Sequence, residues 1–315
     1  MGDQLVNTVV LLAACNGSRH LPELLASLQR QTDPGFTVLM QDDGSSDDTL
    51  SLLEGIAARD PRFIMAKEQG KHFGAAGNFL SLVRQAGSDY TLFCDQDDIW
   101  EEDKIQVLKQ AMADMESEYG SDVPLLVHSD CSLIDEEGKP VGDSFFAHQG
   151  WDPAAVTLPR LLVQNNVTGC TLIMNAPLTK LIAENAKAKE LFMHDWFIAL
   201  TAASFGHIAF VSRPLTRYRQ HGDNAIGASK KSLPVRALSA LMDRDKARRR
   251  ILLTYTHTQV FRKLYEGKLP ADALGVVDAY LATRRMRKIP RVLAVRRMGC
   301  LMQSPVTRMG QLLFG

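Results

Sequence analysis

The feature that most constrains this chain is a regular alternation of short apolar runs with helical patterns through its first part. Apolar runs that are typical of strands occupy residues 9–12, 36–40, 62–65 and 90–94. Between them, apolar residues recur at helical spacing over residues 21–28, 50–57 and 78–85. Such alternation predicts an α/β fold, in which a mainly parallel sheet carries helices on both faces.

Polar side chains follow three of these predicted strands at the point where each strand ends. Asn16 follows the first, Asp42 and Asp43 follow the second, and residues 95–98 (Asp-Gln-Asp-Asp) follow the fourth. Because ligands of open parallel sheets bind at the carboxyl ends of the strands, we expect these groups to converge on one edge of the sheet.

The acidic cluster at residues 95–98 is compatible with a metal site. Two carboxylates one residue apart at a strand end can share a hard cation, and all-oxygen ligands favour Mg²⁺ or Mn²⁺. The alternative is a solvated turn in which Asp98 caps the next helix. The apolar residues on both sides, Phe93–Cys94 and Ile99–Trp100, favour the metal site because a solvated turn is rarely framed in this way.

Charge divides the chain near Ala228. Residues 1–228 hold 17 Lys and Arg against 31 Asp and Glu, whereas residues 229–315 hold 19 against 5. We therefore predict an acidic body over 1–228 and a basic, amphipathic helical region over 229–315.

The pattern over 125–211 is mixed and predicts an acceptor-binding half. No run of about 18 apolar residues predicts a membrane span, and five scattered cysteines are typical of thiols in a reducing compartment.

The basic region admits more than one interpretation. Basic residues between 284 and 297 alternate with Ile289, Val292, Leu293 and Val295, a pattern that suits an anionic membrane surface. Alternatively, the helices pack on the acidic body or form an oligomer contact. Nucleic acid is not the expected partner because the region has few aromatic residues to stack on bases.

Six segments then occur in the order found in family 2 glycosyltransferases of the GT-A fold. They are LLAACNGSRHLPELLASLQRQT, VLMQDDGSSDDT, GKHFGAAGNF, YTLFCDQDDIW, MHDWF and YRQHGDN, and they cover about residues 8–228. The chain resembles the bacterial rhamnosyltransferase-like members of this family in particular. The resemblance implies a Rossmann-like, mainly parallel mixed sheet flanked by helices.

The resemblance also implies roles for individual residues. The donor nucleotide sugar would be bound by the following residues: Ala14, Asn16, Asp42, Asp43, Gly77, Asn78, Asp95, Gln96 and Arg219. Asp97 and His221 would hold the divalent metal, and Asp195 would be the catalytic base. From the residues alone, Asp195 could equally start a helix with Trp196 in the core. His194 and Trp196 are candidates for the acceptor pocket.

The implied activity is inverting transfer of a sugar, with rhamnose as a candidate, from a dTDP- or UDP-linked donor to a hydroxyl of a surface-glycan acceptor on a lipid carrier. We expect a cytoplasmic enzyme, peripheral at the inner face of the membrane, in polysaccharide biosynthesis of the cell envelope. Two rival hypotheses stay open: a noncatalytic membrane-associated assembly protein that keeps the fold, and a metal-dependent nucleotidyltransferase.

Overall fold

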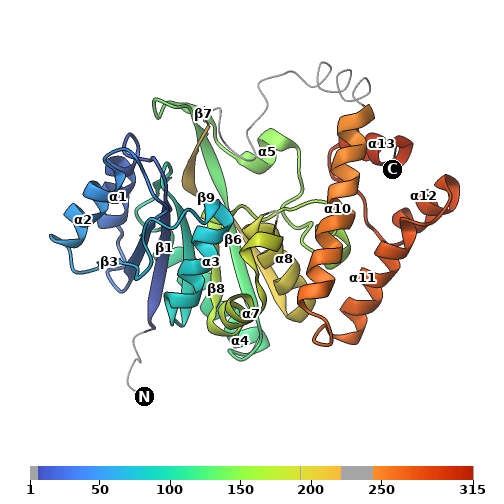
Figure 1. Ribbon diagram of the computed structural model, residues 1–315, viewed down its shortest axis with the longest axis horizontal. Coiled ribbons are helices and arrows are strands. Elements are labelled where there is room, and N and C mark those ends of the chain that lie inside the picture. The colour runs from blue at the N-terminus through green and yellow to red at the C-terminus, as the bar shows by residue number, and fades with distance from the viewer. Residues whose placement is uncertain (1–5, 192, 221–243, 315) are drawn as a thin grey trace.

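A mixed sheet runs through the computed structural model, which describes residues 6–191, 193–220 and 244–314 (Figure 1). Its nine strands in the described ranges are β1 (Thr8–Ala14), β2 (Thr37–Asp42), β3 (Phe63–Met65), β4 (Tyr90–Asp95), β5 (Ile99–Trp100), β6 (Leu125–Ile134), β7 (Pro140–Gly142), β8 (Leu172–Asn175) and β9 (His207–Arg219). They are ordered β3-β2-β1-β4-β8-β6-β9-β5, and β7 pairs with β6. Since β8 is antiparallel to β4 and β6, and β5 to β9, the sheet is mainly parallel but mixed, as predicted.

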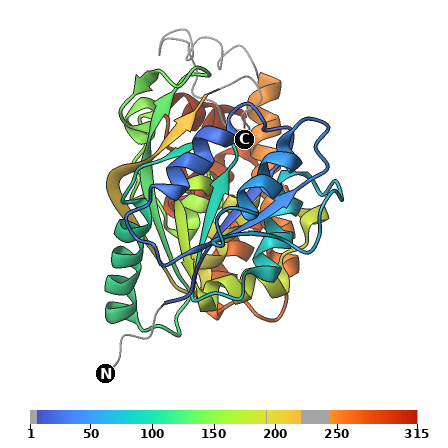
Figure 2. The same cartoon turned by 90° about the vertical axis from the view of Figure 1, so that its left-hand side faces the viewer.

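Helices cover both faces of this sheet. On one side lie α1 (Leu21–Gln29), α2 (Thr49–Ala57) and α4 (Lys104–Tyr119). On the other lie α3 (Gly74–Ala86), α7 (Ala176–Asn185) and α8 (His194–Phe205), so that α3 and α4 flank the sheet from opposite sides in Figure 2. The short helices α5 (Phe145–Gln149) and α6 (Leu158–Leu161) and the 3₁₀ turns η1 (Gly169–Thr171) and η2 (Ala188–Glu190) lie in the connections.

The two faces of β1 explain its unbroken apolar sequence. Val9 and Leu11 belong to the core on the α3 side, while Val10 and Leu12 belong to the core on the α4 side. Successive side chains of a strand point to opposite faces, so a strand with helices on both faces must be apolar at every position.

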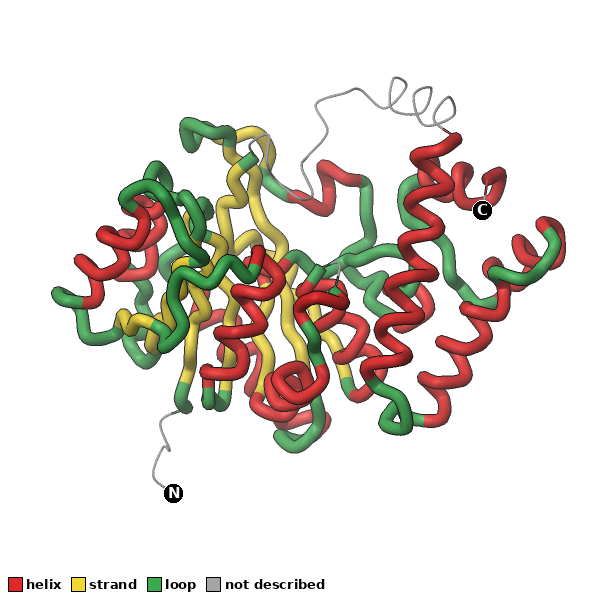
Figure 3. The backbone as a smooth tube through the Cα atoms, in the orientation of Figure 1, coloured by secondary structure: helices red, strands yellow, loops and turns green. Residues whose placement is uncertain are grey.

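The C-terminal region is helical, as predicted, and lies beyond α8 (Figure 3). It comprises α10 (Arg244–Leu264), α11 (Ala271–Thr283), α12 (Lys288–Arg297) and α13 (Pro305–Phe314). Phe261 of α10 and Tyr265, which directly follows this helix, pack on Phe197 of α8, with ring centroids 5.8 and 5.6 Å away. The predicted boundary at residues 228 and 229 falls outside the described residues.

This contact between the two regions is chiefly apolar. Phe261 and Tyr265 are fully buried and belong to the same core cluster as Phe197. An ion pair between Lys263 and Glu190 lies at the edge of the contact. The C-terminal helices therefore share a core with the acidic body. Within the described ranges, no helix is both long and apolar enough to span a membrane.

The shared core can be tested on α10. We expect Phe261→Ala to lower the free energy of unfolding by about 3–5 kcal/mol because it leaves a cavity against Phe197. Leu252→Ala, on the same helix but at a side chain 49% exposed, should change it by less than about 0.5 kcal/mol. Urea denaturation followed by fluorescence measures both. An unchanged transition for Phe261→Ala would show that the two regions do not share a core.

Candidate active site

A cavity of about 430 Å³ opens at the carboxyl ends of β1 and β4. Parallel pairing sets Ala13 of β1 beside Asp95 of β4, and Ala14 beside Asp42 of β2. The polar groups that follow these strands are thereby gathered at one edge, as the sequence predicted. The volume lies within the range of small-molecule sites, about 300–1,000 Å³.

Two of the predicted donor residues shape the loops around the cavity instead of lining it. The Asp42 carboxylate accepts hydrogen bonds from the backbone N–H groups of Gly44 (2.9 Å) and Ser45 (3.0 Å). Gly44 has φ of +89°, which a residue with a side chain adopts only at a cost. The Asn16 side-chain oxygen accepts from the Ser46 N–H at 2.8 Å and ties the loop after β1 to the loop after β2.

Asp43 lines the cavity and also holds the start of α3. Its carboxylate accepts from the backbone N–H groups of Phe73 (2.5 Å) and Gly74 (2.7 Å), which are unpaired donors of the first helical turn. A carboxylate at this position also suits the helix dipole. One side chain thus fixes the cavity wall to β2.

The first turn of α3 forms that wall with small residues. Gly74, Ala75 and Ala76 line the cavity, as does Asn78, whereas Gly77 is buried and is not among the lining residues. Asn78 donates weakly to the Ala14 carbonyl at 3.4 Å, and its side-chain oxygen is buried without a protein hydrogen-bond partner. The small residues leave room for a ligand at the start of the helix.

Gln96 holds the loop after β1. Its side-chain oxygen accepts from the Cys15 N–H at 2.7 Å, and its side-chain nitrogen donates to the Cys15 carbonyl at 2.9 Å. A Cβ at Gly17 would collide with this amide, so glycine permits the close approach. Gln96 lines the cavity, but its amide is already engaged with the backbone.

Asp95 and Asp97 both line the cavity. Burial first, and then the charges of Asp97 and Asp195, raise the pKa of Asp95 to about 7. Carboxylates that repel one another in a confined space are the arrangement that a divalent cation would relieve.

Asp98 does not cap the following helix, so that alternative was wrong. The next element is β5, and α4 begins only at Lys104. Asp98 is fully buried, its carboxylate accepts from the Arg219 backbone N–H at 3.1 Å, and its pKa is raised well above the usual range by burial and by Asp97 and Asp95. It therefore lies behind the cavity.

A buried lysine behind the acids was missed in the sequence. The Lys104 ammonium donates to the Cys170 carbonyl (2.6 Å) and the Thr216 hydroxyl (2.9 Å), and lies 3.4 Å from the centre of the Trp100 ring. Burial lowers its pKa to about 8. Its charge partly offsets that of the carboxylates, and the helical pattern around it gave no sign of this position.

Asp98, Asp95 and the Cys170 thiol also form a group whose possible metal-ligating atoms lie within 4.8 Å of one another. Asp98 and Cys170 are not among the cavity-lining residues. Among the acids at residues 95–98, Asp95 and Asp97 line the cavity. These oxygen donors fit Mg²⁺ or Mn²⁺ better than a buried thiol does.

Asp195 lies in the first turn of α8 and faces the cavity at 6% exposure. Its carboxylate accepts from the Trp196 N–H at 2.7 Å, and the nearby Gly169 N–H and Asn165 side chain also stabilise its charged form. Burial outweighs these interactions and raises its pKa to about 7. A group that exchanges a proton near neutral pH suits general base chemistry.

The two candidate acceptor residues point in different directions. His194 lines the cavity and packs against Phe79 and Phe93, with ring centroids 4.5 and 5.6 Å away, and burial lowers its pKa to about 4. Trp196 is buried, donates to the Leu161 carbonyl at 2.6 Å, and packs against His257. Trp196 is therefore a core residue.

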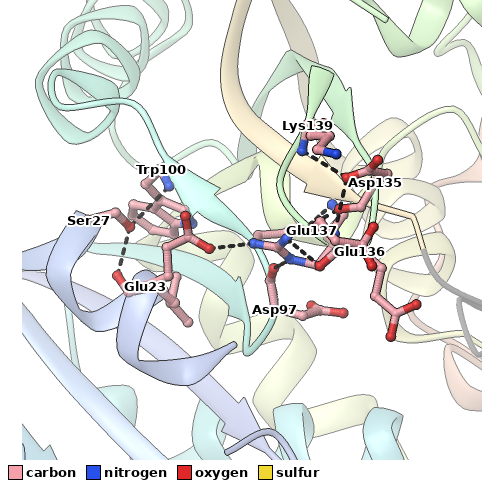
Figure 4. Close-up of polar contacts among 11 residues, drawn as sticks. Glu23, Ser27, Asp97, Trp100, Asp135, Glu136, Glu137 and Lys139 are labelled. Atoms are coloured by element: carbon pink, nitrogen blue, oxygen red, sulfur yellow. Dashed lines mark hydrogen bonds and ion pairs between the residues drawn. The ribbon is translucent and has the colours of Figure 1, made fainter. Parts of the chain in front are cut away.

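Arg219 is buried and its guanidinium already has several partners. It donates to the Asp97 carbonyl (2.8 Å), to the carbonyls of Asp135 (3.2 Å) and Glu136 (3.0 Å), and to the Glu23 carboxylate (2.7 Å). Figure 4 shows these four partner residues, which come from distant parts of the chain. This arrangement ties β9 to the loop after β4, and Arg219 is not among the residues that line the cavity. His221 lies outside the described residues.

Part of the cavity wall was not predicted. It consists of residues 165–169 and an aromatic group in which the ring of Phe145 lies 5.8 Å from Trp151 and 6.2 Å from Tyr218. The segment Ser144–Trp151 carries three aromatic residues in a polar stretch. These aromatic residues were the sequence feature that could have indicated this part of the cavity wall.

The sheet order and the acidic cavity at its edge define a glycosyltransferase architecture of the GT-A type, and solved structures of low identity share the fold. The structure of Staphylococcus aureus TarS 1–349 in complex with UDP aligns with a TM-score of 0.53 and 17% identity, over 97% of this chain and 90% of that one. Mannosyltransferase PcManGT from Pyrobaculum calidifontis, in complex with GDP-Man and Mn²⁺, aligns with a TM-score of 0.55 and 15% identity, over 94% and 74%.

Residues 9–121 match the family model described as glycosyl transferase family 2, in agreement with the family that the motifs resemble. Over 231 residues it is 29% identical to the dTDP-rhamnosyl transferase RfbG of Shigella flexneri, which covers 69% of this chain and 74% of that protein. It is 25% identical over 232 residues to the putative glycosyltransferase EpsH of Bacillus subtilis, covering 71% and 64%.

Proposed function

We propose that this protein transfers a sugar from a dTDP- or UDP-linked donor, with rhamnose the first candidate, to a hydroxyl of a surface-glycan acceptor on a lipid carrier. The observation that carries the proposal is the cavity in which Asp95, Asp97 and Asp195 meet. The similarity to a protein named dTDP-rhamnosyl transferase supports the choice of donor.

The donor half of the cavity is built from β1, β2, β4 and α3. In the proposal the nucleoside lies between the loop at Ala14 and Cys15 and the start of α3, near Asp43 and Asn78. Asp97 and Asp95 would hold Mg²⁺ or Mn²⁺ at the diphosphate. When bound, the cation would stabilise the negative charge of the departing nucleoside diphosphate.

Asp195 is the proposed base. Its carboxylate takes the proton of the acceptor hydroxyl while that oxygen attacks the anomeric carbon of the donor sugar. The bond from this carbon to the diphosphate oxygen breaks, and the nucleoside diphosphate leaves with the electron pair. A single displacement of this kind inverts the anomeric centre. Buried surroundings keep Asp195 a stronger base than an exposed carboxylate.

The metal role can be tested with Asp97→Asn. In a transfer assay with dTDP-rhamnose, Mn²⁺ and a lipid-linked glycan acceptor, we expect chelation to abolish release of dTDP and added Mn²⁺ to restore it. Asp97→Asn should lower kcat by about 10²-fold or more, since it removes a charged ligand at the leaving group. Asp114→Asn makes the same charge change at an exposed position of α4 and should not affect kcat.

Two other outcomes would refute the proposal. Release of pyrophosphate would identify nucleotidyl transfer. Binding of the donor with no turnover, under conditions in which the protein is folded, would identify a noncatalytic assembly protein.

The base role predicts a pH dependence. Asp195→Asn should lower kcat by about 10²–10⁴-fold. In the wild type the carboxylate must be unprotonated, so kcat/KM for the acceptor should be constant above the pKa of about 7. Below it the rate should fall by roughly tenfold per pH unit. The measurement is the pH dependence of kcat and kcat/KM for the wild type and for Asp195→Asn. If the variant has wild-type rates, Asp195 is not the base.

The membrane role extends the proposal to the C-terminal helices. On α12 the apolar side chains Ile289 (74% exposed) and Leu293 (48% exposed) lie one helical turn apart. Exposed basic residues surround them in the sequence: Arg284, Arg285, Arg287, Lys288, Arg296 and Arg297. Exposed apolar and basic groups on one helix suit insertion at an anionic lipid surface, so we propose a cytoplasmic protein peripheral at the inner membrane face.

Vesicle binding tests this surface. Ile289→Ser with Leu293→Ser should weaken binding to phosphatidylglycerol-containing vesicles by roughly tenfold or more, because each apolar side chain contributes about 1.5–3 kcal/mol when buried. Val141→Ser, at a 51% exposed position on β7, is the matched control and should bind normally. Binding should also weaken with salt. Equal binding by all three proteins would contradict the assignment to α12.

A further inference from the structure

The linker between α12 and α13 contacts the cavity wall through one residue. The Gln303 side-chain oxygen accepts from the Asp152 backbone N–H at 2.6 Å, and its side-chain nitrogen donates to the Asn166 side-chain oxygen at 2.8 Å. The Gln303 backbone N–H donates to the side-chain oxygen of Gln164 at 3.0 Å. Each partner lies more than 130 positions earlier in the sequence.

Two of these partners, Gln164 and Asn166, belong to a segment without regular structure that continues into the cavity wall. Residues 164–168 lie in neither a helix nor a strand, so no backbone ladder holds them. Side chains do so instead. Asn166 donates to the carbonyls of Asp152 (2.9 Å) and Pro153 (3.1 Å), and the Asn165 side chain bonds to both the N–H (3.0 Å) and the carbonyl (2.8 Å) of Val167.

The same segment reaches Asp195. Asn166 lines the cavity, as do Asn165 and Asp195, and the Asn165 side chain lies close enough to Asp195 to stabilise its charged carboxylate. The Gly169 N–H, at the end of the segment, stabilises the same charge. Gln303 is thus connected to Asp195 through Asn166 and its neighbours.

We propose that Gln303 is a positioning residue, through which the C-terminal helices hold the segment 164–169 and thereby orient Asp195 and the adjoining cavity wall. The proposal rests on the proposed function for its kinetic consequence, since Asp195 acts there as the base. Its structural content, the restraint of the segment by Gln303, does not depend on that function.

The kinetic test compares Gln303→Ala with a matched change. We expect Gln303→Ala to lower kcat/KM for the acceptor by about tenfold or more, because small displacements of a reacting group can cost up to about 10²-fold. Its affinity for dTDP should stay within about twofold of wild type. Lys263→Met removes another polar contact between the C-terminal helices and the body, the ion pair with Glu190, and should leave both quantities unchanged.

The second readout needs no turnover. Hydrogen exchange of peptides that cover residues 164–169 should be faster in Gln303→Ala and unchanged in Lys263→Met. If Gln303→Ala does not fold, Gln303→Glu serves in both tests, because it keeps an acceptor for the Asp152 N–H and loses the donor to Asn166. Wild-type exchange in the folded Gln303 variant overturns the proposal whether or not the protein transfers sugar.

A double mutant separates coupling from independent effects. Asn166→Ala should slow transfer by a similar factor, and Gln303→Ala with Asn166→Ala should be no slower than the slower single variant. Multiplicative losses would overturn the proposal. An inactive wild type would refute the proposed function alone, whereas an active wild type with an equally active Gln303→Ala would refute only this inference.

Discussion

The position of β1 between β2 and β4 is the constraint on which the rest of the structure depends. In-register parallel pairing aligns the ends of the three strands, and the chain must leave each strand at the same edge. The loop after β1, the turn at Asp42 and Asp43, and the acids after β4 are therefore neighbours before any side chain makes a contact. Their mutual bonds, such as that of Gln96 to Cys15, then fix the loops.

Packing many acids at this edge has an electrostatic cost that the fold meets in several ways. The carboxylates of Asp42 and Asp43 accept hydrogen bonds from backbone N–H groups, which stabilise their negative charge. Asp98 is buried with a strongly raised pKa, and Lys104 supplies a buried positive charge nearby. Asp95 keeps a raised pKa. A cation at the donor side of the cavity would relieve the remaining repulsion between these carboxylates.

The sequence predicted the parallel core because that part of the fold depends on local patterns. The runs at β1, β2 and β4 are apolar on both faces, and the helices between them have clear spacing. The insertion of β8 between β4 and β6 could not be predicted in this way, since only distant pairing determines it. Arg219 and Lys104 show the same limit for side chains: their partners come from elements far away in the chain, so their burial and bonding leave no local pattern.

The sequence likewise predicted some of the residues that line the cavity and missed others. Asp95, Asp97 and Asp195 line it, as expected, because they follow a strand or begin a helix within recognisable motifs. Trp196 was a candidate for the acceptor pocket together with His194, but its side chain is buried and donates to the Leu161 carbonyl. The wall at residues 165–169 was not predicted because its conformation depends on hydrogen bonds to residues distant in the chain, which leave no local sequence motif.

The bonds of Gln303 have a consequence for protein engineering. A chimera that takes its C-terminal helices from a relative would keep the contact between Gln303 and Asn166 only if the relative carries a side chain able to donate to Asn166 at the position of Gln303. An exchange designed to keep this contact would replace residues 150–169 together with residues 244–314, although the strands β8 and β9 lie between these two ranges in the chain.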